Sequence, residues 1–358
     1  MNYYIHVPFC RSKCGYCVFY SEPAPSEEAE DAYLKHLESI LSRYEPSGPC
    51  ETVYFGGGTP TLLDEARLER LFSLVEHRLR PGPETEISIE ANPETLTAAK
   101  VRLIRGFANR MSLGVQSFSP RLRKTLGRDC SQQALNRALD RIAAARFPHW
   151  NCDLIYAIPG QTAEDFARDL DRAVSLGVDH LSCYSLTPEE GARLADTLIP
   201  DEDAAARMWN LAGQCGLPRY EISNSANPGA ECRHNVNVWR GGLLAGFGPA
   251  AAGFDGENRT AEPASLASWL RGEPPEIDAI PHEARLNEIF TVNLRTVAGW
   301  TPELWAKVPG ADPWEARLAA ARRAAAETLP LWFDISPERI TLNDSGLLFW
   351  NSVAEELL

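Results

Sequence analysis

The sequence lacks several features that mark particular classes of protein. No apolar run approaches the roughly 18 residues of a membrane-spanning helix. There is no block of lysine and arginine, and the formal net charge is −14, so we expect no nucleic-acid partner. No cleavable signal segment is expected, because Cys10 already stands where such a segment would lie. These absences favour a cytoplasmic protein.

Cysteines are few and unevenly spread. Nine in 358 residues are too few for a disulfide scaffold. Six are scattered and are typical of reduced, mostly buried thiols: Cys50, Cys130, Cys152, Cys183, Cys215 and Cys232. The remaining three, Cys10, Cys14 and Cys17, follow directly after the apolar run Tyr3–Val7.

Three thiolates on one short loop can hold three irons of a cuboidal 4Fe-4S cluster. Such a cluster keeps one iron without a protein ligand, and an open metal position is where chemistry occurs. The alternative is a structural zinc knuckle, but closed zinc sites take four ligands. His6 is the nearby candidate for a fourth ligand, and its spacing is wrong for a zinc finger.

Apolar runs alternate with helical patterns through the first two-thirds of the chain. The predicted strands are Asn2–Val7, Thr52–Phe55, Glu86–Ile89, Arg110–Val115, Asn151–Ile155 and His180–Leu186, each followed by a helix-length segment. This alternation indicates parallel βαβ units in an α/β fold. Periodicity alone cannot separate an open barrel from a doubly wound sheet. Polar and glycine-rich segments follow the strand carboxyl ends, where barrel enzymes keep their sites, and this favours a barrel.

The pattern changes after about residue 226. We expect the barrel over residues 1–226 and a linker region over 227–281, mostly loop with a short helix at Leu266–Leu270. Residues 282–358 are expected to form a small, helical, winged-helix-like domain. It would include a hairpin made by Leu331–Ile335 and Arg339–Leu342.

The residues flanking the cysteines resemble a known family. Tyr4-Ile5-His6-Val7-Pro8-Phe9-Cys10 and Cys14-Gly15-Tyr16-Cys17 look like the opening of the oxygen-independent coproporphyrinogen III oxidase group, within the radical S-adenosylmethionine (SAM) superfamily. In the true oxidases a further cysteine follows the third after one residue. Here that position is Phe19, as in the heme-chaperone branch of the group.

The resemblance covers almost the whole chain and implies a partial (β/α)6 barrel that binds a 4Fe-4S cluster and SAM. It implies a heme chaperone that takes electrons from a donor and passes heme to apo-proteins, including membrane respiratory enzymes. The first alternative is the oxidase itself, which Phe19 disfavours. The second is a metal-stabilised binding protein without redox chemistry. No catalytic side chain is assigned, and whether SAM is cleaved stays open.

The candidate SAM residues follow strand ends. Gly57, Gly58 and Thr59 belong to a glycine run that is either a tight turn or a segment whose amides form an anion-binding nest. Glu90 and Asp153 would otherwise be solvated loop acids. The resemblance implies that the glycine run contacts the amino group of SAM and that the two acids hold its ribose hydroxyls.

Four further positions match SAM contacts of the group. Arg128 would hold the methionine carboxylate as a charge-assisted pair, the alternative being a surface salt bridge. The resemblance also implies contacts from Tyr4 and Gln116, and packing of Tyr16 against adenine.

The segment Cys232–Trp239 resembles the His-Asn-x-x-Tyr-Trp heme motif of the chaperone branch. His234 is the candidate axial ligand, since neutral imidazole binds heme iron well. The tyrosine position is Val238, and a second histidine of relatives is replaced by Ala252. Two interpretations remain, a heme ligand or a hydrogen-bonded structural histidine. The segment is expected to place heme near the open end of the barrel, beside the cluster.

Overall fold

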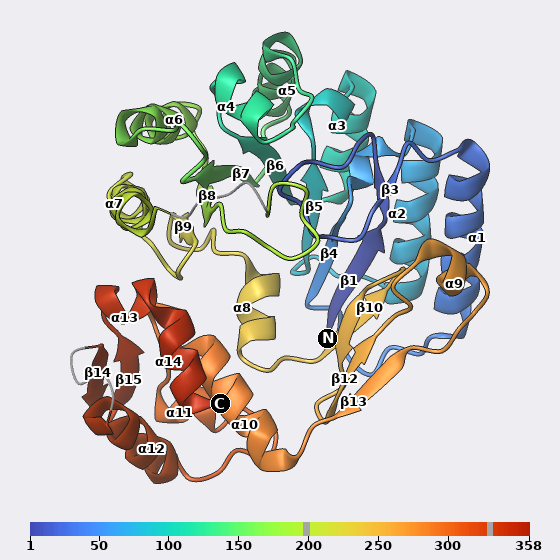
Figure 1. The fold of residues 1–358 in the computed structure, drawn as a ribbon. Coiled ribbons are helices and arrows are strands. Elements are labelled where there is room, and N and C mark those ends of the chain that lie inside the picture. The colour runs from blue at the N-terminus through green and yellow to red at the C-terminus, as the bar shows by residue number, and fades with distance from the viewer. Residues whose placement is uncertain (196–200, 328–331) are drawn as a thin grey trace.

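A central sheet organises the computed structural model, which describes residues 1–195, 201–327 and 332–358 (Figure 1). The strand order is β13-β12-β11-β10-β1-β4-β5-β6-β7-β8-β9. Its parallel part consists of β1 (Asn2–Val7), β4 (Thr52–Gly57), β5 (Glu86–Ala91), β6 (Arg110–Gln116), β7 (His149–Tyr156) and β8 (His180–Ser185). These are the predicted strands, shifted by at most two residues at an end.

Helices cover the outer face of these strands (Figure 1). They are α1 (Glu27–Arg43), α2 (Glu65–Leu79), α3 (Ala98–Phe107), α4 (Pro120–Thr125), α5 (Gln132–Ala145), α6 (Ala163–Ser175) and α7 (Glu202–Gly213). Each long helix buries an apolar stripe, such as Leu68, Leu71, Phe72 and Val75 of α2, against the sheet. Short 3-10 turns, Pro60–Leu62 and Pro93–Thr95, follow β4 and β5. The expected partial (β/α)6 barrel is confirmed.

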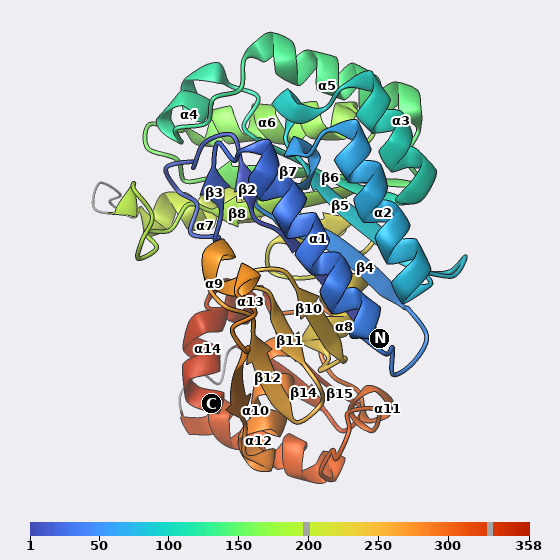
Figure 2. The same ribbon diagram turned by 90° about the vertical axis from the view of Figure 1, so that its right-hand side faces the viewer.

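Residues 227–281 form more regular structure than the expected linker. β9 (Asn224–Ala226) pairs with β8, and β10 (Leu244–Phe247) pairs in parallel with β1. β11 (Ala252–Phe254), β12 (Asn258–Ala261) and β13 (Glu276–Ala279) extend the sheet in antiparallel fashion (Figure 2). The helix α9 (Leu266–Leu270) lies where predicted. The loop prediction was wrong for β12 and β13, because these four-residue strands are mostly polar and give no apolar alternation.

The last part of the chain is helical with one hairpin. It contains α10 (His282–Asn293), α11 (Pro302–Trp305), α12 (Trp314–Glu327), β14 (Phe333–Ser336), β15 (Arg339–Leu342), α13 (Asp344–Leu348) and α14 (Trp350–Leu357). Trp300 and Trp305 are buried at its centre with ring centroids 5.1 Å apart. The predicted hairpin is present as β14–β15, while Leu331 lies outside the described residues. The domain boundaries themselves stay a prediction.

None of the described helices combines the length and apolar character needed to cross a bilayer.

The short helix α8 (Arg233–Trp239) closes the amino ends of the barrel strands. The carboxylate of Glu86 accepts hydrogen bonds from the backbone N–H groups of Arg233 and His234, both at 2.9 Å. Asn237 Nδ2 donates to Asn2 Oδ1 at 3.0 Å. Asn2 and Glu86 begin β1 and β5, so α8 lies at the end of the barrel where the chain starts (Figure 1). The cysteine loop lies at the opposite end, after β1.

We therefore expect Glu86→Ala to destabilise the protein. The change leaves two amide donors of α8 without a partner, which costs about 1–3 kcal/mol of the free energy of unfolding. Urea denaturation measures it. Glu84→Ala is the matched control, because the Glu84 side chain is exposed two residues away. Equal stability of the two variants would contradict the capping role of Glu86.

Candidate cofactor site

One cavity of about 400 Å3 runs from the cysteine loop into the barrel. Eleven of the predicted site residues line it: Cys10, Cys14, Tyr16, Cys17, Gly57, Gly58, Thr59, Glu90, Gln116, Arg128 and Asp153. They come from six segments that are distant in sequence. Tyr4 and His234 are not among the lining residues.

The cysteine loop is held at both ends and in the middle. The two-residue strands β2 (Phe9–Cys10) and β3 (Glu22–Pro23) pair with each other and close the loop. Gly15 N–H donates to Leu126 O at 3.0 Å, which ties the loop to the segment after α4. Arg128 Nη1 lies 3.9 Å from Cys14 Sγ. These contacts fix the position of the loop, and its three cysteines line the cavity.

The donor chemistry of the loop fits an iron–sulfur cluster. Cys10, Cys14 and Cys17 are free thiols, each half-buried. Among the described residues, no group of three His, Cys, Asp or Glu side chains has the geometry to hold a single metal ion. A cuboidal cluster needs a different arrangement, with one thiolate for each of three separate irons.

The glycine run brings β4 against the cysteine loop. Gly57 has φ +104, and a Cβ on it would lie 2.6 Å from the His6 ring. A Cβ on Gly58 would lie 2.6 Å from the carbonyl oxygen of Phe9. The Tyr4 hydroxyl lies 3.1 Å from His6 Nδ1 and positions the ring. Tyr4 therefore supports the contact between His6 and Gly57 without lining the cavity itself. Only glycine allows the two backbones to approach this closely.

Two backbone N–H groups of the glycine run already have hydrogen-bond partners within the protein. Gly58 N–H donates to Val7 O at 2.9 Å, and Thr59 N–H donates to Phe9 O at 2.7 Å. The expectation of an anion-binding nest is therefore wrong for these two donors. The N–H groups close the turn instead. A ligand amino group needs acceptors, which carbonyl oxygens supply.

Arg128 is a buried cation that faces the cavity without a carboxylate partner. Its Nη2 donates to Asn92 Oδ1 at 2.6 Å and to Gly114 O at 2.8 Å, and its Nε has no partner among the described residues. Asn92 Nδ2 in turn donates to Thr59 Oγ1 at 2.8 Å. Sequence reasoning missed Asn92, although its place directly after β5 was a usable signal. A buried guanidinium with a free donor is suited to a ligand carboxylate.

Glu90 and Asp153 are the two acids inside the barrel. Tyr54 donates its hydroxyl proton to Glu90 at 2.8 Å. Ser112 Oγ and Asn151 Nδ2 donate to Asp153 at 2.9 and 2.7 Å. Burial, and then the charge of Asp153, raises the pKa of Glu90 to about 7, and burial also raises the pKa of Asp153. Both carboxyl groups keep lone pairs that can accept protons from ligand hydroxyls.

Two residues with positive φ end the neighbouring strands. Gln116 has φ 66 beside a register shift between β6 and β7, and Ala157 has φ 58 after β7. A non-glycine residue with positive φ has a strained backbone, so contacts with the surrounding structure must keep it in this conformation. Tyr16 packs against a small apolar cluster next to these ends: Leu122, Leu126, Ile155, Ile158 and Leu186.

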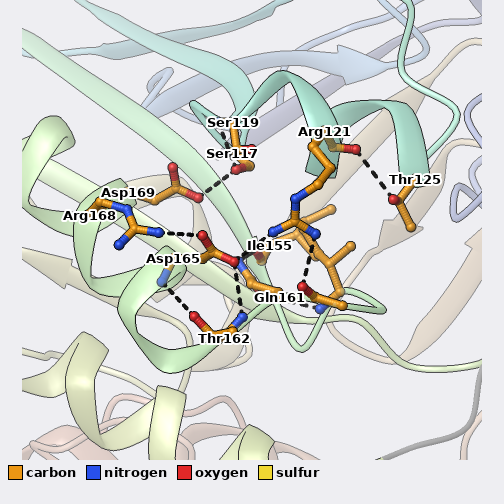
Figure 3. Close-up of polar contacts among 12 residues, drawn as sticks. Ser117, Ser119, Arg121, Thr125, Ile155, Gln161, Thr162, Asp165, Arg168 and Asp169 are labelled. Carbon is orange, nitrogen blue, oxygen red and sulfur yellow. Dashed lines mark hydrogen bonds and ion pairs between the residues drawn. The ribbon is translucent and has the colours of Figure 1, made fainter.

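Polar contacts hold the loops after β6 and β7 together (Figure 3). Ser117 Oγ donates to Asp169 at 2.6 Å. The Arg121 guanidinium donates to Gly160 O at 2.9 Å and to Asp165 at 2.7 Å. Asp165 also closes the capping box of α6 with Thr162. These bonds fix the edge of the cavity where Gln116 and Ile155 lie.

His234 is not a lining residue of this cavity, although Cys232 and Asn235 on either side of it are. It is 6% exposed, its Nδ1 is 2.7 Å from Thr52 Oγ1, and its ring centroid is 5.1 Å from that of Tyr54. Burial lowers its pKa to about 4. The segment forms α8 at the amino ends of the strands, and its residues Cys232 and Asn235 line the inner end of the cavity. Heme ligation by His234 stays a prediction. The geometry favours the structural interpretation of His234.

The raised pKa of Glu90, which is buried near Asp153, predicts that the stability of the protein depends on pH. Because the folded pKa of Glu90 is about 7, above the usual 4.5, the folded state keeps a proton that the unfolded state has lost. The free energy of unfolding should therefore fall, by at most about 3 kcal/mol, as pH rises from about 4.5 through 7.

Glu90→Gln should remove this part of the pH dependence and gain stability relative to the wild type at about pH 8. Urea denaturation of both proteins at about pH 5 and pH 8 measures it, with the exposed Glu84→Gln as control. Parallel pH curves for wild type and Glu90→Gln would refute the assigned shift.

Comparisons with known proteins agree with this site. Residues 4–173 match the Radical SAM superfamily. The chain is 35% identical to the heme chaperone HemW of Mycobacterium tuberculosis, with 99% of this chain and 94% of the relative covered. It is 36% identical to HemW of Escherichia coli, covering 71% and 70%, and 30% identical to HemW of Bacillus subtilis, covering 86% of each.

The fold is also that of a solved structure, the coproporphyrinogen III oxidase HemN of Escherichia coli, described as a radical SAM enzyme. The TM-score is 0.84 at 21% identity, covering 99% of this chain and 89% of the other. At that identity the match concerns the fold. On the sequence matches, this chain belongs to the radical SAM superfamily and, within it, to the HemW family.

Proposed function

We propose that this protein is a heme chaperone that carries a 4Fe-4S cluster and SAM and delivers heme to apo-proteins. The observation that carries the proposal is the gathering of eleven predicted cofactor residues around one cavity. It is supported by HemW relatives that match nearly the whole chain. Its setting would be the cytoplasm, where the thiols stay reduced.

The cavity offers a group for each part of SAM. Cys10, Cys14 and Cys17 would hold three irons, and SAM would bind the fourth. Arg128, whose guanidinium lines the cavity, would pair with the methionine carboxylate. Glu90 and Asp153 would accept the ribose hydroxyl protons. Gln116 at the end of β6 would contact SAM from the same edge.

The remaining contacts are apolar or indirect. Tyr16 and the apolar cluster beside it would pack on the adenine. Tyr4 would act by holding His6 under the glycine run. A reduced cluster held by the three cysteines would supply one-electron reduction of SAM, so the protein would need an electron donor. The protein side chains bind, orient and keep water from the ligand.

Phe19 favours the proposed heme chaperone over the oxidase alternative. It stands where the resemblance implies a cysteine in the true oxidases and can supply no thiol. The second alternative, a zinc-stabilised binding protein, would give a colourless protein, whereas an iron–sulfur protein purified without oxygen is brown. Respiratory enzymes are the acceptors that the resemblance suggests.

The cluster assignment predicts that Cys14→Ala abolishes binding of an intact 4Fe-4S cluster, because one iron loses its thiolate. Iron and sulfide analysis after anaerobic reconstitution measures it. Cys50→Ala is the control, since Cys50 lies outside the cavity lining. A full complement of iron and sulfide in Cys14→Ala would rule the assignment out.

The function predicts that the reconstituted protein binds hemin with a distinct Soret band and transfers it to the heme-free form of a b-type respiratory protein. With SAM and reductant, it should not convert coproporphyrinogen III to protoporphyrinogen IX. Heme-transfer spectroscopy and product chromatography are the two measurements. Multiple-turnover decarboxylation would replace the chaperone with the oxidase, and absence of hemin binding would remove the chaperone function.

A further inference from the structure

A tyrosine of the cysteine loop connects the loop to three other segments of the chain. Tyr20 comes shortly after Cys17, and its carbonyl oxygen lies 3.0 Å from His6 Nε2. Its hydroxyl donates to the Glu22 carboxylate on β3 and accepts from the backbone N–H of Leu266 at 2.6 Å. Tyr20 is not among the residues that line the cofactor cavity. It therefore acts on the site only through the groups that it holds.

The hydroxyl joins the loop to α9. Leu266 begins that helix, and the first N–H groups of a helix have no partner within it. The Ser265 side chain accepts from the N–H of Ser268, and the Tyr20 hydroxyl accepts from the N–H of Leu266. The same hydroxyl donates its only proton to Glu22. Two hydrogen bonds therefore fix the phenol between α9 and β3.

The carbonyl of Tyr20 decides which tautomer of His6 is present. A carbonyl oxygen only accepts hydrogen bonds, so His6 Nε2 carries the proton, and Nδ1 accepts from the Tyr4 hydroxyl at 3.1 Å. Burial lowers the pKa of His6, which keeps the ring neutral. The ring lies against Gly57, where an added Cβ would come within 2.6 Å of it. The position of Tyr20 thus determines the orientation of the ring against which the glycine run packs.

A second contact connects α9 to the beginning of the loop. Trp269 of this helix is 1% exposed, and its ring centroid lies 5.4 Å from that of Tyr33. The Tyr33 ring lies 5.5 Å from that of Phe9 on β2, and the Tyr33 hydroxyl donates to His6 O at 2.9 Å. The helix α9 therefore supports the first part of the loop through Trp269 and the last part through Tyr20.

We propose that Tyr20 is a positioning residue of the cofactor site, which couples α9 to the cysteine loop and to the glycine run. The inference rests on the proposed binding of a 4Fe-4S cluster and SAM. It extends the support of that site to residues 227–281. The segment expected as a linker holds the cysteine loop from outside the barrel.

The test uses the full-length, anaerobically reconstituted protein and the variant Tyr20→Phe. This change removes the hydroxyl and keeps the ring, the three cysteines and the lining of the cavity. The cluster should still assemble. SAM affinity, measured by calorimetric titration, should fall about tenfold, because the loop and the His6 ring are no longer fixed. The electron paramagnetic resonance spectrum of the reduced protein with SAM should change as well.

Two controls separate positioning from general stabilisation. Tyr44→Phe removes a hydroxyl from a residue that follows α1 and packs on Phe247, with ring centroids 5.0 Å apart. Glu86→Ala weakens the fold at the amino ends of the strands. Both variants should keep the SAM affinity and the spectrum of the wild type. If Glu86→Ala changes them as much as Tyr20→Phe does, at a matched loss of stability in urea, Tyr20 has only a structural role and the inference is overturned.

A double-mutant cycle tests the route through the hydroxyl. Glu22→Ala removes one of the two hydroxyl partners and should weaken SAM binding by less than Tyr20→Phe does. The double variant should bind SAM no more weakly than Tyr20→Phe alone, since the two residues act through one bond. If Tyr20→Phe assembles no cluster, Glu22→Ala carries the test, and wild-type SAM affinity in that variant would overturn the inference.

The outcomes separate this inference from the proposed function. If the wild type binds no cluster or no SAM, the proposed function fails. If the wild type binds both and Tyr20→Phe matches Tyr44→Phe in SAM affinity and in spectrum, the function stands and this inference is overturned.

Discussion

The close contact between the glycine run and the cysteine loop is the constraint on which the site depends. A side chain at Gly58 would meet the Phe9 backbone at 2.6 Å, and the N–H groups of Gly58 and Thr59 are bonded to Val7 and Phe9. The loop is therefore fixed to the carboxyl end of β4 with little freedom. Because β4 neighbours β5 in register, the thiols are also placed relative to Glu90.

A hydrogen-bonded chain of buried groups stabilises the acids inside the barrel. Asn151 donates to Asp153, and its carbonyl oxygen lies 2.7 Å from His180 Nδ1. His180 Nε2 lies 2.8 Å from the Tyr220 hydroxyl, which accepts from the Cys232 amide at 3.3 Å. Burial lowers the pKa of His180 far below its usual value, so the ring is neutral and donates from one nitrogen only. The chain connects the Asp153 carboxylate to the start of α8 at the other end of the barrel.

The sequence was sufficient for the barrel and for most of the site. The buried parallel strands read as apolar runs, and their carboxyl ends meet at one edge, so residues such as Gln116 and Asp153 could be brought together without coordinates. The strands β12 and β13 could not be foreseen, because each is four residues long and mostly polar, so neither shows an apolar alternation. Asn92 directly follows β5 and could have been proposed for the site, but its role as a bridge between Thr59 and Arg128 depends on contacts that only the fold brings together.

His234 shows the limit of a local motif. The pattern around it is typical of a heme ligand, yet the direction of α8 is decided by Glu86, which lies 148 positions away in sequence from His234. By binding the first amides of the helix, that carboxylate fixes α8 in a position where His234 Nδ1 lies 2.7 Å from Thr52 Oγ1. At the amino ends of the strands, buried hydrogen bonds such as those from α8 to Glu86 hold the fold. At the carboxyl ends, the three thiols and the Arg128 guanidinium line the cavity, where a ligand can reach them.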